Sequence, residues 1–172
     1  MTITAVRKDP RSRTVTLEAE FDASPERVWQ LWADPRQLER WWGPPAYPAT
    51  VEAHDLRPGG RVAYRMTGPE GDEHRGYWDV DDVQPPHRLV VRDGFANRDG
   101  TPDAALPVTT LRVTIRDLSG GRTRITIESE VPTVEAMERL AAMGTEEGRR
   151  QAVGQIDAIL AEDPAAAGRG RR

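Results

Sequence analysis

The feature that most constrains this chain is a series of short segments in which apolar and polar residues alternate. From Thr14 to Phe21 every second residue is apolar, which is the pattern of a strand with one buried face. Further segments are typical of strands bounded by turn residues: 50–56, 61–67, 75–83, 88–93, 109–118 and 122–131. The tight turn at Ser119-Gly120-Gly121 favours an antiparallel pair. We therefore expect a curved antiparallel sheet of about six or seven strands, with a β-bulge near Asp81-Asp82, where the alternation slips.

Helices are predicted in two places. Ser24-Pro25 and Asp34-Pro35 each place an N-cap before a proline, which predicts two short helices after the first strand. A long amphipathic segment runs from Val134 to about Ala161, with a kink expected at Gly144 and a new N-cap at Thr145. Because this segment carries one apolar stripe, it is the natural cover for the concave face of the sheet. The predicted fold class is α+β.

Length and composition limit the classes of protein to which the chain can belong. Its 172 residues predict a single domain over 13–161, a flexible N-terminal leader over 1–12 and a disordered tail over 162–172. The chain has no cysteine, which excludes disulfides and thiolate zinc sites and fits a reducing, cytoplasmic compartment. A net charge of −4 argues against a nucleic-acid partner. No apolar run approaches the ~20 residues of a membrane span.

Candidate catalytic and metal-binding residues are few. The histidines His54, His74 and His87 stand in no metal-ligand spacing, so we expect surface or packing roles and no metal or other cofactor. Asp79 and Asp81 share one strand face, as an acid–base pair would. Their neighbours Trp78 and Val80 are expected on the buried face of the strand, however, so we expect both carboxylates to be solvated. No catalytic residue is predicted.

Four segments, taken in chain order, carry a resemblance to a known family. They are FDASPERVWQLWADPRQLERWWGP at 21–44, DLRPGGR at 55–61, PPHRLV at 85–90 and MGTEEG at 143–148. Together they resemble the START-like superfamily (SRPBCC), and within it the Aha-type family, named after the activator of the ninety-kilodalton heat-shock ATPase. The resemblance implies a helix-grip fold, in which the sheet wraps around the last helix and encloses an apolar, hydrophobic pocket. Relatives bind lipids, polyketides or plant hormones, some cyclise polyketides, and one branch stimulates a chaperone ATPase.

The same resemblance implies a ligand-binding site between the sheet and the last helix. The residues expected to line it are Trp41, Trp42, Tyr64, Met66, Trp78, Val113, Arg149, Ala152 and Ile156. Arg149 departs from the family, because relatives tend to carry a large aromatic residue there. An unpaired buried guanidinium costs several kcal/mol, which leaves three outcomes. Its head reaches water, pairs with an inward carboxylate of the sheet, or lines a hydrated pocket for an anionic ligand group.

Three functions remain open on the sequence. The first is non-catalytic binding of a small apolar molecule, lipid-like or aromatic, with or without a carboxylate. The second is an enzyme of the polyketide cyclase type, which needs two or more titratable side chains in the pocket, where the sequence offers only Arg149. The third is a chaperone-regulating, stress-related or other protein-interaction module, which needs an exposed apolar patch. The expected partners are thus a small apolar molecule, or a chaperone or other protein, with the chain a monomer or homodimer.

Overall fold

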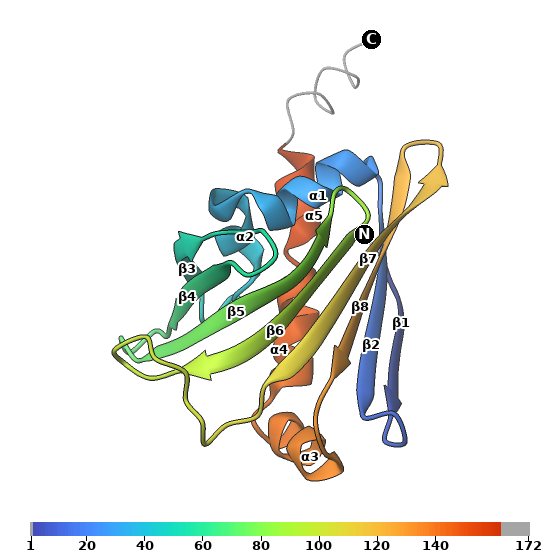
Figure 1. Ribbon diagram of the computed structural model, residues 1–172. Helices are drawn as coiled ribbons and strands as arrows, with labels where there is room; N and C mark the ends of the chain where they lie inside the picture. Colours follow the sequence, from blue (N-terminus) through green and yellow to red (C-terminus); the bar gives the residue numbers. More distant parts are fainter. Residues whose placement is uncertain (1, 163–172) are drawn as a thin grey trace.

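Eight antiparallel strands form one curved sheet in the computed structural model, which describes residues 2–162 (Figure 1). The strands are β1 (Thr2–Asp9), β2 (Thr14–Phe21), β3 (Ala49–His54), β4 (Arg61–Thr67), β5 (Glu73–Gln84), β6 (Arg88–Ala96), β7 (Thr109–Ser119) and β8 (Arg122–Glu130). Their order across the sheet is β1-β2-β8-β7-β6-β5-β4-β3. The α+β class and the antiparallel sheet are confirmed, with one strand more than the sequence predicted. The register shift between Val80 and Asp82 confirms the expected bulge.

The two short helices begin where the sequence places their caps. They are α1 (Pro25–Ala33) and α2 (Pro35–Trp41). The Ser24 hydroxyl accepts a hydrogen bond from the backbone N–H of Arg27 at 3.2 Å, and the Asp34 carboxylate accepts one from that of Arg36 at 2.9 Å. These bonds satisfy N–H groups that have no partner inside the helix, which is why each helix starts there.

The extra strand corrects the prediction of a flexible leader over residues 1–12. β1 pairs with β2 from Thr2 opposite Glu20 to Asp9 opposite Thr14. A register shift between Ile3 and Ala5 inserts one residue, so that both Ile3 and Val6 pair with inward-facing residues of β2. Because this bulge interrupts the period of two, the apolar alternation that marks a strand is hidden in the sequence.

The C-terminal segment forms three helices where one kinked helix was expected. They are α3 (Val134–Ala142), α4 (Thr145–Val153) and α5 (Ile156–Ala161). Gly144 has a φ of 82°, in the left-handed region that favours glycine, and it turns α3 across one end of the sheet (Figure 1). The N-cap predicted at Thr145 is wrong, because its hydroxyl donates back to the Leu140 carbonyl at 2.9 Å. α4 and α5 lie along the concave face, as expected of the last helix.

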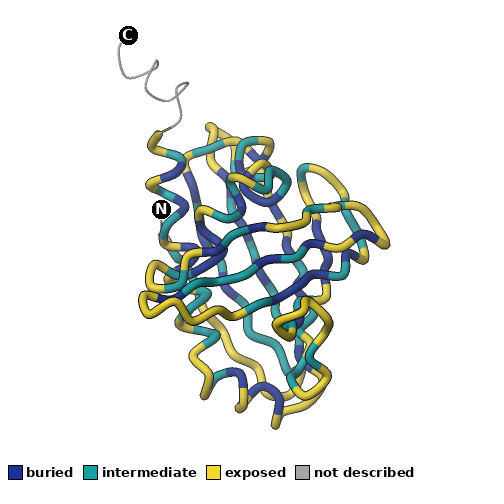
Figure 2. Tube along the Cα trace, turned by 90° about the vertical axis from the view of Figure 1, so that its left-hand side faces the viewer, coloured by how far each residue is buried: buried dark blue, intermediate teal, exposed yellow. Residues whose placement is uncertain are grey.

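The apolar core is divided into two clusters. The larger one joins the concave face of the sheet to α1, α2, α4 and α5, and it contains the fully buried Trp32, Trp41 and Trp78. The smaller one joins α3 to the near ends of the strands, through Val131, Ala136, Met137 and Leu140. In Figure 2 buried segments alternate with more exposed ones along the strands, as expected of a sheet with one covered face.

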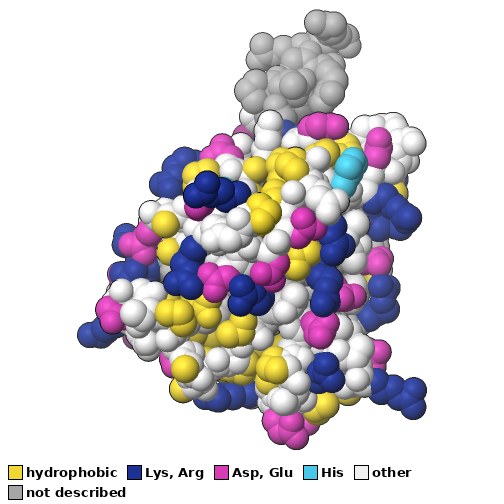
Figure 3. All heavy atoms as spheres, in the orientation of Figure 1, with side chains coloured by type: hydrophobic (Ala, Val, Ile, Leu, Met, Phe, Trp, Pro, Cys, Tyr) yellow, Lys and Arg dark blue, Asp and Glu magenta, His cyan; other side chains and the backbone are white. Residues whose placement is uncertain are grey.

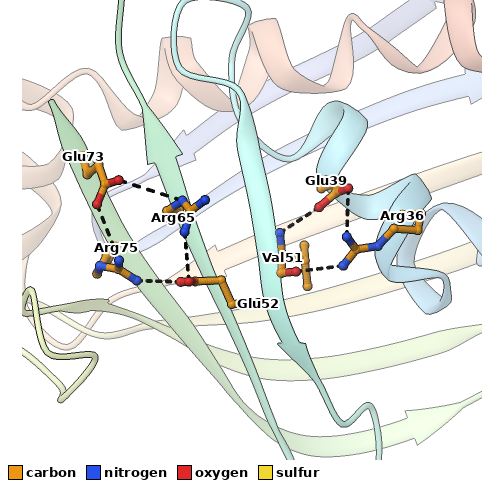
Figure 4. Close-up of polar contacts among 7 residues, drawn as sticks. All are labelled: Arg36, Glu39, Val51, Glu52, Arg65, Glu73 and Arg75. Carbon is orange, nitrogen blue, oxygen red and sulfur yellow. Dashed lines mark hydrogen bonds and ion pairs between the residues drawn. The ribbon is translucent and has the colours of Figure 1, made fainter. Parts of the chain in front are cut away.

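The free edge of β3 is blocked by side chains from α2 (Figure 4). Glu39 accepts a hydrogen bond from the Val51 N–H at 2.9 Å, and Arg36 donates to the Val51 carbonyl at 2.8 Å. The neighbouring Glu52 lies between Arg65 and Arg75 of the next two strands. Occupied backbone groups and charges along an edge prevent it from pairing with another chain.

Two other expectations concern the ends and surface of the chain. The tail predicted over 162–172 lies outside the described residues, apart from Glu162, whose carboxylate pairs with Arg40 at 2.7 Å. Within residues 2–162 no helix is long and apolar enough to cross a membrane.

Candidate functional site

A cavity of about 480 Å³ lies between the two apolar clusters. Its walls come from the concave ends of the strands and from α3 and α4. The apolar part of the lining includes Val15, Leu17, Trp42, Met66, Phe95, Ile127, Val131, Met137 and Leu140. Small-molecule sites in proteins are mostly apolar cavities of roughly 300–1,000 Å³, so this space has the size and character of a ligand pocket.

The inner face of α4 keeps this space open. Residues three and four apart share one face of a helix, so Thr145, Gly148, Arg149 and Ala152 all face the sheet. A Cβ atom added at Gly148 would have no other atom within 4 Å. The glycine therefore leaves empty a volume that a larger side chain would occupy.

A cluster of three polar side chains interrupts the apolar wall. Tyr64 on β4 donates a hydrogen bond to Oδ1 of Asp93 on β6 at 2.7 Å, although β5 lies between these strands. The phenol crosses β5 at Gly76, which is the cross-strand partner of Tyr64. A Cβ at this glycine would collide with the Tyr64 ring. The absence of a side chain at Gly76 thus allows Tyr64 to reach the carboxylate.

Arg149 completes the cluster from the helix side. Its Nη2 lies 3.8 Å from Oδ2 of Asp93, and its Cζ lies 4.8 Å from the centre of the Trp42 ring. Its side chain is 21% exposed, and its Nη1 is fully buried. Of the three outcomes open on the sequence, pairing with an inward carboxylate is therefore the one observed, and the pair lines the cavity.

The guanidinium of Arg149 is not saturated by these contacts. A distance of 3.8 Å is too long for a hydrogen bond, and no other residue of the described chain accepts one from this side chain. Nη1 is fully buried without a partner. Buried donors without a partner are rare and costly, so a group that accepts hydrogen bonds from Arg149 would stabilise the site.

Burial sets the protonation of this cluster. It raises the pKa of Asp93 from 3.8 to about 6, even though Arg149 and the Tyr64 hydroxyl both favour the carboxylate form. Burial lowers the pKa of Arg149, and Asp93 opposes that shift. For Tyr64, burial raises the pKa well above its usual value and the adjacent Asp93 raises it further. Near neutral pH the cluster is thus a guanidinium cation beside a carboxylate that takes up a proton readily.

Four of the nine residues predicted to line the site do so: Trp42, Tyr64, Met66 and Arg149. The other five, Trp41, Trp78, Val113, Ala152 and Ile156, lie in the larger core cluster and are at most 1% exposed. The reason is position along the concave face. α1, α2 and α5 pack directly on the sheet at one end, whereas the cavity lies at the end near α3.

The main residue that sequence reasoning missed is Asp93. It follows Leu89 and Val91 at the period of two along β6, and both of these are fully buried. A carboxylate on the inward face of a strand is unusual, and this alternation was the available signal. Its partners Tyr64 and Arg149 come from segments 29 and 56 residues away and meet it only in the folded sheet.

The other candidate residues have structural contacts. A ring nitrogen of His54 lies 3.1 Å from the Trp32 carbonyl, and one of His87 lies 3.1 Å from the Ile115 carbonyl. Asp79 pairs with Arg61 and Asp81 with Arg92 on the outer face, which confirms that these carboxylates do not form a buried pair. Over the described part of the chain, no group of three or more potential ligands is arranged to hold a metal ion.

Comparison with known proteins places the chain among relatives of known structure. Residues 22–161 match the family described as Activator of Hsp90 ATPase homolog 1-like protein. The crystal structure of protein Ms6760 from Mycobacterium smegmatis is 47% identical, with a TM-score of 0.86 over 94% of this chain and 99% of its own. A solution structure from Arthrobacter aurescens is also 47% identical, with a TM-score of 0.90 over 95% and 94%. No match was found among curated proteins.

Proposed function

We propose, since this chain belongs to the family of Activator of Hsp90 ATPase homolog 1-like proteins, that it binds a small, mostly apolar ligand in the cavity without transforming it. The family match confirms the Aha-type, START-like resemblance of the sequence. The ligand has a lipid-like or aromatic body, which the apolar walls cover. It carries one polar group that accepts hydrogen bonds from Arg149.

The observation that carries this proposal is the unsaturated guanidinium of Arg149 in a mostly apolar cavity. Arg149 is stacked on Trp42 and faces Asp93 at 3.8 Å, yet it donates no hydrogen bond within the described chain. A hydrogen bond to a charged group is worth about 1.5–3 kcal/mol, so an acceptor on the ligand would fix its orientation. The apolar walls supply the rest of the binding free energy by excluding water.

A cavity-filling variant tests the proposal. The neutral dye Nile red should bind the wild-type protein, and the flat aromatic ketone 2-acetonaphthone should displace it. Gly148→Leu places a side chain in the open volume beside α4 and should weaken both compounds at least tenfold. The same change replaces glycine in a helix, which adds about 0.5–1 kcal/mol of stability. Lost binding in a protein that is no less stable would show that the cavity is the binding site.

The matched control is Gln151→Leu, on the exposed face of the same helix. It should leave the dissociation constants of dye and ketone within about threefold of wild type, since a surface change away from the cavity has a small effect. Equal binding by wild type and Gly148→Leu, measured by fluorescence titration, would refute the proposed site.

An enzyme of the polyketide cyclase type is the second candidate, because three titratable groups do converge in the cavity. In such a reaction the Asp93 carboxylate takes a proton from the carbon next to a ligand carbonyl. The C–H electron pair forms the enolate double bond, and the charge moves to oxygen, where Arg149 donates a hydrogen bond. Exchange of the acetyl protons of bound 2-acetonaphthone in D₂O, absent in Asp93→Asn, would favour this candidate over binding alone.

A further inference from the structure

We infer that Asp93 makes the cavity selective for ligands whose polar group is an uncharged acceptor, such as a ketone or an ester, and that a carboxylic acid binds only together with a proton. This inference rests on the proposed function and specifies the class of ligand. It makes Asp93 a specificity-determining residue of the same site.

Arg149 is the one cation that would face two anions, the Asp93 carboxylate and the carboxylate of an acidic ligand. Arg149 Nη2 is 3.8 Å from Oδ2 of Asp93, so a ligand group that accepts from this guanidinium lies within a few ångströms of the carboxylate. An uncharged carbonyl leaves the ion pair intact. A ligand carboxylate instead brings a second negative charge into the same buried site. Two carboxylates in such a site share one proton, because both cannot be ionised there.

No second cation of the lining is available to neutralise an acidic ligand. Arg13 is hydrogen-bonded to the Val131 carbonyl and paired with Glu130 at 3.8 Å, and Arg75 is paired with Glu52. The remaining charged or titratable side chains around the cavity are paired as His74 with Asp72, Glu146 with Lys8, and Arg150 with Glu147. The Tyr64 hydroxyl already donates a hydrogen bond to Asp93. An anion on Arg149 therefore meets the full charge of Asp93 unless that carboxylate is protonated.

A dependence of affinity on pH follows. The pKa of Asp93 in the unliganded protein is about 6, so its protonated fraction falls about 50-fold between pH 6 and pH 8. Carboxylic acids themselves titrate near pH 4 and are fully ionised over the same range. The dissociation constant of an acidic ligand should thus rise about 50-fold between pH 6 and pH 8. That of an uncharged ketone should not change.

The experiment compares two ligands of nearly the same shape. Displacement of Nile red by 2-acetonaphthone and by 2-naphthoate is measured at pH 6, 7 and 8. In the wild-type protein the ketone should bind equally at all three values and the acid should weaken about 50-fold. In Asp93→Asn, which keeps the size of the side chain, the acid should bind independently of pH and at least tenfold more tightly than wild type at pH 8.

Histidine is the side chain that ordinarily changes charge in this pH range, so His74→Gln is the matched control. In His74→Gln the affinity for 2-naphthoate should fall between pH 6 and pH 8 as much as it does in wild type. If the acid binds wild type equally at pH 6 and pH 8, or if His74→Gln abolishes the loss, the inference is wrong. Ketone binding to Asp93→Asn reports that this variant is folded. If neither compound displaces the dye from wild type, the proposed function itself is wrong. If the ketone binds but the affinity of the acid does not change with pH, only the inferred selectivity is wrong.

Discussion

At the scale of single residues, the candidate site depends on one arginine in an apolar stripe and one carboxylate on an inward strand face. Arg149 is recognisable in the sequence, because its neighbours on the same helix face are apolar. The alternation along β6 signals that Asp93 faces inward, but its contact with Arg149 was not predictable from the sequence, because Tyr64, Gly76 and Asp93 are brought together by the pairing of three strands. Stacking on Trp42 contributes up to about 2 kcal/mol and helps to hold the guanidinium within an apolar stripe.

The raised pKa of Asp93 predicts how stability depends on pH. Between pH 3.8 and about 6 the folded protein holds this proton and the unfolded chain does not. The stability from this raised pKa is therefore fully present below about pH 4 and is lost as pH rises through 6. At ~1.4 kcal/mol per pKa unit, the free energy of unfolding of wild type relative to Asp93→Asn should fall by about 2–3 kcal/mol between pH 4 and pH 7.

Urea unfolding of both proteins at pH 4, 5, 6 and 7 measures this difference. Asp81→Asn serves as the control, because Asp81 forms an exposed pair with Arg92 on the outer face. A difference between wild type and Asp93→Asn that stays constant with pH, or that grows as pH rises, would contradict a buried carboxyl group with a raised pKa.

At the scale of elements, sequence patterns predicted most of the sheet, the bulge near Asp81 and both capped helices, and they were wrong at β1 and at the junction of α3 and α4. The bulge in β1 places Ile3 and Val6 on one face although they are three residues apart, so the segment lacks the period-two alternation that predicts a strand. Gly144 in the left-handed region separates α3 from α4, so the last helix covers less of the sheet than expected. The cavity therefore lies near α3, and five of the predicted lining residues lie outside it in the larger core cluster.

Removal of residues 1–12 tests the corrected role of β1. Ile3 packs against the larger core cluster, Val6 lines the cavity, and Lys8 pairs with Glu146 of α4 at 3.1 Å. The truncated protein should lose at least about 2 kcal/mol of stability, the contribution of one large buried side chain. It should also self-associate through the freed edge of β2. Urea unfolding and size-exclusion chromatography measure both, and unchanged stability with a monomeric profile would support a flexible leader.

At the scale of the whole molecule, the site exists because the core is split. The larger cluster contains the buried tryptophans and α5, and the smaller one contains α3. The space between them is lined mostly by apolar side chains, with the Arg149 cluster in its wall. Over the face seen in Figure 3, positive and negative side chains are interspersed, so no basic stripe appears there. The large hydrophobic side chains exposed within the described residues are Val6, Val108, Val134 and Met143. Val134 and Met143 lie at opposite ends of α3, and Val6 and Val108 belong to other segments, so the cavity is the better supported site for a ligand.

The most direct test of ligand binding in this cavity is an NMR titration of ¹⁵N-labelled wild-type protein with 2-acetonaphthone. If the ketone binds there, the changing signals should be the backbone amides of cavity-lining residues on β4, β6, α3 and α4, together with the side-chain N–H of Arg149. In Gly148→Leu these changes should disappear. No change at saturating ketone, or changes confined to the outer face of the sheet, would show that the ketone does not bind in this cavity.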